Sequence, residues 1–136
     1  MKHHSIEQLQ ALADVRPLPP MTRTERLERW ARLLEQQPNQ HLATLPGTEH
    51  ASQAERLAMR IAGSPITVAF EDSTFRTAGL VDDTYGEAKR FFDLSDWQLH
   101  NIVCQCHLGN AVTSASAARR VRAAIGLWTR IRAFFA

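Results

Sequence analysis

The chain is poor in cysteine and contains no long apolar run. It has two cysteines among 136 residues, and a chain of this length buries a core without disulfide or metal staples. No apolar run approaches the roughly 18 residues of a membrane span, and Met1-Lys2-His3-His4 leads into a polar helical pattern rather than a signal-peptide core. We therefore expect a cytoplasmic, single helical domain over 1–136, with 126–136 as a peripheral or interface-forming tail of the last helix.

The two cysteines, Cys104 and Cys106, are separated by one residue. This spacing gives poor geometry for an ordinary disulfide. The pattern places both on one helix, where side chains two residues apart diverge. We therefore expect two reduced thiols, which suits a reducing compartment.

Familiar catalytic motifs are also missing. The sequence has no P-loop, no glycine-rich dinucleotide fingerprint, no GxSxG elbow and no HExxH. His100 and Cys104 have the i, i+4 spacing of a Cys–His dyad, but no orienting third group or oxyanion donor can be named. The sequence thus predicts no catalytic residue and favours a protein that is not an enzyme.

What is present is a dense set of helix start and stop signals, which predict an all-α fold. We expect a compact bundle of five to seven short helices with at most a minimal two-stranded β element. Ile66–Phe70 is the one β-like run, with 41–45 as its only plausible mate, and a buried extended segment or helical turn is favoured over a strand there. The expected helices run from Ser5 to about Val15, Thr22 to about Gln37, Thr48 to Gly63, Asp72 to Ala78, Thr84 to the corner at 92–95, Ser95 to near Gly109, and from about Thr113 onward.

Three capping boxes and the helical periodicity support this assignment. The boxes begin at Thr22, Thr84 and Ser95, each followed three residues later by Glu or Gln. Apolar residues at 3–4 spacing define the expected core. That core comprises Leu27, Trp30, Leu34, Leu57, Ile61, Phe70, Phe75, Phe91, Phe92, Leu99, Ile102, Val121, Ile125 and Trp128.

A first candidate site is the face formed by His100, Cys104 and His107 at i, i+4, i+7. Imidazole and thiolate are good ligands for zinc, and iron is the other metal we consider. The outer two residues lie about 10 Å apart along a helix axis, so a site needs further ligands from distant histidines. The sequence requires no cofactor, and ordinary helix chemistry remains the favoured interpretation.

A second candidate is the corner between the two helices that meet at Leu94 and Ser95, which has the hydrophobic spacing of a helix-turn-helix. In that interpretation Gln98 and Asn101 contact nucleic acid. The second helix carries no Lys or Arg, and Asp96 near its start would repel phosphate. A purely structural corner is therefore favoured, and binding to nucleic acid is the alternative.

The third candidate is the basic last helix. Residues 117–136 carry five arginines and no acid, so the remainder has 11 basic and 14 acidic residues, a net charge of −3. The end of the helix is apolar on more than one side, which suits an interface, although a solvated basic face is the simpler explanation. Our function hypothesis is an interaction or regulatory module that binds a protein partner or a second copy. The residues expected to bind the partner are Arg119, Arg122, Trp128, Arg130 and Phe134.

Overall fold

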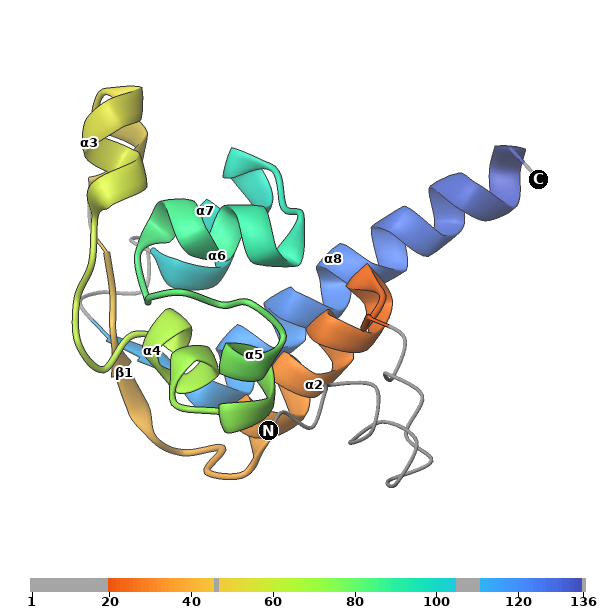
Figure 1. The fold of residues 1–136 in the computed structure, drawn as a ribbon, viewed down its shortest axis with the longest axis horizontal. Coiled ribbons are helices and arrows are strands. Elements are labelled where there is room, and N and C mark those ends of the chain that lie inside the picture. Colours follow the sequence, from red (N-terminus) through yellow and green to blue (C-terminus); the bar gives the residue numbers. More distant parts are fainter. Residues whose placement is uncertain (1–19, 46, 105–110, 136) are drawn as a thin grey trace, which may run out of the picture.

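The fold is a set of short helices gathered around two longer ones, α2 and α8 (Figure 1). The structure, a computed structural model, describes residues 20–45, 47–104 and 111–135. Seven α-helices, one 3₁₀ helix and one two-stranded sheet lie in these ranges, so the all-α prediction is confirmed. The elements are α2 (Arg23–Glu35), β1 (His41–Ala43), η1 (Thr48–His50), α3 (Gln53–Ala58), α4 (Pro65–Phe70), α5 (Ser73–Thr77), α6 (Tyr85–Phe92), α7 (Asp96–Val103), β2 (Ala111–Thr113) and α8 (Ser114–Phe135).

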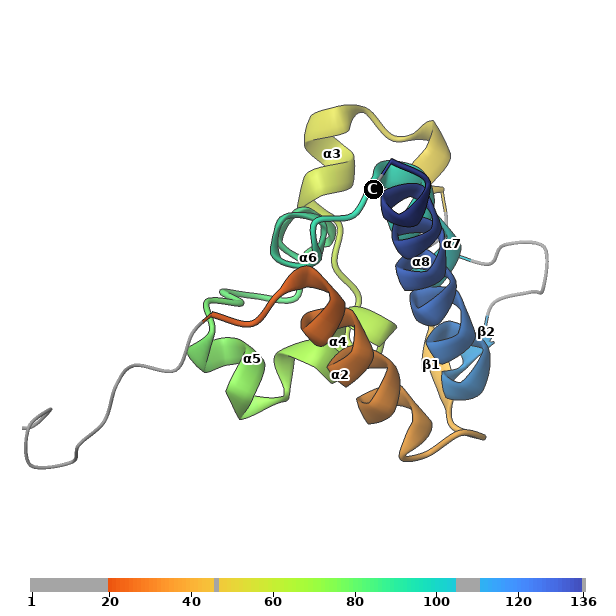
Figure 2. The same cartoon turned by 90° about the vertical axis from the view of Figure 1, so that its right-hand side faces the viewer.

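The helices α2 and α8 lie side by side and run in opposite directions (Figures 1 and 2). Their buried faces come from the predicted apolar stripes, with Leu27 and Trp30 on α2 and Val121 and Ile125 on α8. The expected first helix, Ser5 to Val15, lies outside the described residues. The helix α8 continues through Gly126 without interruption.

Aromatic rings fill the centre of the core. Trp30 stacks on Phe92 with ring centroids 4.2 Å apart, and Phe75 meets Phe91 and Phe92 edge-on at 5.4 Å. The indole N–H of Trp30 donates to the carbonyl of Pro65 at 3.0 Å. Each of these arrangements adds to the burial energy of the rings, so α2, α5 and α6 are locked around one cluster.

The predicted caps at Thr22 and Ser95 are complete capping boxes. At Thr84 only half of the box forms. The hydroxyl of Thr84 accepts from the amide of Glu87, but the carboxylate of Glu87 accepts from the amide of Val81 at 2.7 Å. The corner after α6 is closed by Asp93, which has φ 51°, a conformation that Asp tolerates better than most residues.

Of the two structures favoured for Ile66–Phe70, a buried extended segment or a helical turn, the chain forms the helical one, as part of α4. Ser64 caps it and Pro65 occupies its first turn, and these start signals outweigh the β-branched residues that follow. The strand at His41–Ala43 pairs instead with Ala111–Thr113, in antiparallel register. The minimal β element is thus confirmed, but its second strand is not the one that the sequence suggested.

The prediction of a single helix from Thr48 to Gly63 is wrong. The chain forms η1, then α3, and becomes extended at Met59, because Ser52 starts a new helix with its own capping box to Glu55. Leu57 and Ile61, expected in the core, are each 37% exposed for this reason. Phe70 is partly buried against the core rather than within it, and the side chain of Trp128 lies outside the described part.

None of the helices in the described ranges combines the length and the apolar character that a membrane crossing requires.

Candidate functional site

The basic helix α8 is tied to α2 by one of the arginines expected to bind a partner. The guanidinium of Arg122 contacts the carboxylate of Glu28 at 2.9 Å and that of Glu35 at 2.6 and 3.2 Å. Hydrogen bonding to Glu35 raises the pKa of Arg122 and, reciprocally, lowers the pKa of Glu35. Arg122 therefore has an ion-pairing role within its own chain.

The last part of α8 extends past the beginning of α2 (Figure 1). With 22 residues against 13, α8 is the longer helix by nine residues, or about 13 Å of axis. In the described part of the chain, α8 packs mainly against α2, α7 and β2. Arg119, near its start, is exposed, whereas the side chains of Trp128, Arg130 and Phe134 lie outside the described part.

The His100, Cys104, His107 face is only partly described. The ring nitrogen Nδ1 of His100 is hydrogen-bonded to the hydroxyl of Thr48, and the ring lies 6.4 Å from that of Trp97. His107 lies outside the described residues. Within the described ranges, no group of three or more metal-ligating side chains comes together.

Cys104 is fully buried and its sulfur is in a disulfide, which contradicts the expectation of a reduced thiol. That expectation assumed that both cysteines lie within one helix. The helix α7 ends at Val103, and Cys104 is its C-cap residue, so the divergence of helical side chains does not apply. A disulfide sulfur is not a thiolate ligand, and metal binding at this face requires the reduced form of Cys104.

The corner between α6 and α7 has the expected arrangement of two short helices. The side chain of Gln98 is used internally, because its oxygen accepts from the amide of Ser95 at 3.0 Å. Asn101 lines a small groove of about 180 Å³ between α7 and α8, together with Trp97 and Arg120. Asp96, at the first position of α7, places a carboxylate where a nucleic acid phosphate would approach, so the geometry adds no support for DNA recognition.

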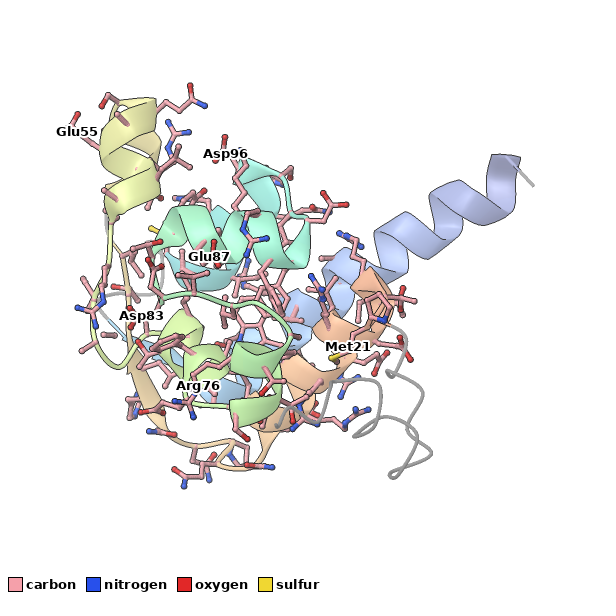
Figure 3. All side chains as sticks on the ribbon, viewed as in Figure 1. Met21, Glu55, Arg76, Asp83, Glu87 and Asp96 are labelled. Atoms are coloured by element: carbon pink, nitrogen blue, oxygen red, sulfur yellow. The ribbon has the colours of Figure 1, made fainter. Side chains whose placement is uncertain are left out.

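A cleft that the sequence analysis missed lies beside this corner, where η1, α3, α6 and α7 meet. Its volume is about 440 Å³. Figure 3 shows Asp96 in the part of the molecule that also carries α3 and Glu55. The segment 48–63, expected to be one helix, is divided into η1 and α3, and this division forms the cleft. The only sequence signal for the division is the capping-box spacing of Ser52 and Glu55. Its walls are Thr48, Arg56, Tyr85, Asp96, Trp97 and His100.

Asp96 is the electrostatic centre of the cleft. Its carboxylate lies 3.2 Å from Nη1 of Arg56, 3.4 Å from Nζ of Lys89 and 3.2 Å from the hydroxyl of Tyr85. Although desolvation alone would raise it, the pKa of Asp96 is lowered by Lys89, Tyr85 and Arg56. The pKa of Tyr85 is raised by burial and by the neighbouring carboxylate, so the phenol stays protonated and the carboxylate charged at neutral pH.

Comparison with known proteins yields no relative: no protein-family model, no curated protein and no solved structure matches this chain significantly.

Proposed function

We propose that the protein is a non-catalytic interaction module that associates with a second copy of itself through the end of α8. The observation that carries the proposal is the extension of α8 beyond α2, the helix that covers its first half (Figure 1). Among the described residues, α2 and α7 are the helices that pack most closely on α8, and a helix end that extends beyond them is available to another surface.

The sequence of this extension supports an interface. Residues 127–135 read Leu-Trp-Thr-Arg-Ile-Arg-Ala-Phe-Phe, with five large apolar residues and no acid. Aromatic residues and arginine are the side chains enriched at protein interfaces, and they supply most of the binding energy there. The composition therefore fits docking on a protein surface better than free solvation.

Charge complementarity favours a second copy as the partner. Residues 117–136 carry five positive charges, whereas the rest of the chain has a net charge of −3. Two helix ends placed against one another would repel, but the end of one helix on the body of the other copy is attracted. The Arg122 pairs with Glu28 and Glu35 within one chain illustrate the same chemistry between α8 and an acidic helix face.

Sedimentation velocity over a range of concentrations tests the proposal with the full-length chain. We expect a dimer whose dissociation constant rises about tenfold or more in Trp128→Ala and Phe134→Ala, the size of effect typical of interface hot spots. Val81→Ala, which removes an apolar side chain that is 71% exposed elsewhere, is the matched control and should leave association unchanged. A chain that stays monomeric at every concentration would refute self-association.

A further inference from the structure

We infer that the cleft at the start of α7 is a binding site for a planar aromatic anion, such as an aromatic carboxylate. Six side chains from four elements form its walls, and one of them, Trp97, is a large apolar side chain that is 71% exposed. Its volume of about 440 Å³ falls within the range of pockets that hold small molecules. The inference is independent of self-association through α8.

The walls select a flat aromatic group. Three of the six lining residues, Tyr85, Trp97 and His100, carry rings. The Trp97 and His100 rings lie 6.4 Å apart with an angle of 26° between their planes. Trp97 is 71% exposed, so its face is open to a ligand, and aromatic rings gain from stacking as well as from burial.

The charges select an anion. Arg56 and Lys89 both contact the single carboxylate of Asp96, so the group as a whole keeps one positive charge. The carboxylate already accepts from these two cations and from the hydroxyl of Tyr85. A cationic ligand would therefore meet Arg56 on the wall of the cleft and an acid whose charge is largely compensated by Arg56 and Lys89, which costs free energy.

Arg56 is held in place to meet the anion. Its Nε donates to the carbonyl of Thr48 at 2.9 Å and its Nη2 to the carbonyl of Ala51 at 3.1 Å. With the contact to Asp96, the described residues use three of the five N–H donors that a guanidinium carries. The remaining donors belong to a guanidinium that these three contacts already hold, on a side chain that is only 21% exposed. Because the side chain is already ordered, less conformational entropy is lost when an anion binds.

The test uses 2-naphthoate as the probe and the full-length chain, with binding followed by calorimetry and by NMR shifts of the cleft residues. We expect saturable binding of 2-naphthoate, with 2-naphthalenemethanol, the neutral isostere, weaker by about fivefold or more. Cyclohexanecarboxylate, which lacks the aromatic face, and the cation 2-naphthylmethylammonium should be weaker still. This series needs no substitution, so it does not depend on the folding of a variant.

Variants then locate the site. Trp97→Ala and Arg56→Gln should each weaken 2-naphthoate about fivefold, the loss of one aromatic contact or one partly screened charge. Val81→Ala is the control for an exposed apolar residue outside the cleft and should bind normally. The inference is overturned if no saturable binding occurs, if the neutral or cationic probe binds as tightly, or if Trp97→Ala leaves affinity unchanged, since the last result would place the anion outside the cleft.

Discussion

Gly86 shows how a single residue can fix the distance between two elements. A Cβ added at this position of α6 would lie 2.8 Å from the carbonyl oxygen of Leu57 and 3.1 Å from its Cβ, both on α3. The cleft depends on this approach, because α3 carries Arg56 and α6 carries Tyr85. Gly126 on α8 is the opposite case, with no atom within 4 Å of an added Cβ.

This contrast gives a matched pair of substitutions. Gly86→Ala should lower the free energy of unfolding by about 1–3 kcal/mol, because a backbone atom must move to admit the methyl group. Gly126→Ala should raise it by up to about 1 kcal/mol, since alanine is the better helix former. Urea unfolding followed by circular dichroism measures both, and a stabilised Gly86→Ala would mean that α3 does not pack as described.

Asp72 carries a second prediction at this scale, on pH. Arg29 donates two hydrogen bonds to its carboxylate, at 2.7 and 2.9 Å, and this contact is the main reason why the pKa of Asp72 is lowered. A lowered folded-state pKa stabilises the protein above the unfolded-state value of about 3.9, and the stabilisation is lost as the pH falls through the folded-state pKa.

Asp72→Asn should therefore cost about 1–3 kcal/mol near pH 6, the loss of hydrogen bonds to a charged group. The difference from the wild type should begin to shrink as the pH falls below about 4, the unfolded-state pKa, and should be lost once the pH is below the lowered folded-state pKa, where the aspartate is neutral like the asparagine. Unfolding free energies at pH 6 and pH 3 measure this. A difference that is the same at both values would show that the effect comes from the hydrogen bond that the Asp72 side chain accepts from the amide of Phe75 at the start of α5, and not from the charge.

At the scale of elements, the caps were the features most reliably predictable from the sequence. Thr22 and Ser95 begin their helices as expected because a capping box is a local arrangement that needs no distant contact. The split of the 48–63 segment was not anticipated, although Ser52 and Glu55 carry the same signal. The apolar residues after Ser52 suggested a continuous helix, but the chain becomes extended at Met59, whose carbonyl accepts from the amide of Tyr85 at the start of α6 at 2.9 Å.

The α2–α8 pair yields a prediction about Arg122. Because its partners Glu28 and Glu35 are on the same chain and all three side chains are more than a third exposed, Arg122→Met should cost less than about 1 kcal/mol of unfolding free energy. Self-association should persist, as sedimentation would detect. Loss of the dimer with little loss of stability would instead assign Arg122 to the interface, as the sequence analysis originally expected.

For the whole molecule, composition and periodicity were enough to predict the helical class and most of the aromatic core. The candidate cleft could not be predicted in this way, because Thr48, Arg56, Tyr85 and Asp96 are separated along the chain and no spacing rule links them. Such a site is a product of tertiary packing. The extension of α8 is an intermediate case: its composition and the lengths of the two helices can be read from the sequence, but the packing of α2 along the first half of α8 cannot.

If the positively charged end of α8 docks on the acidic body of a second copy, the dissociation constant of the dimer should depend on salt. The sign of this salt dependence is the most direct test of the proposal. Sedimentation equilibrium of the full-length chain at about 50 and 300 mM salt compares two degrees of charge screening. We expect a dimer whose dissociation constant rises at the higher salt concentration, because opposite charges meet across the interface. A dimer that tightens with salt would indicate that like-charged helix ends face one another, and a monomer at both salt concentrations would contradict the proposal altogether.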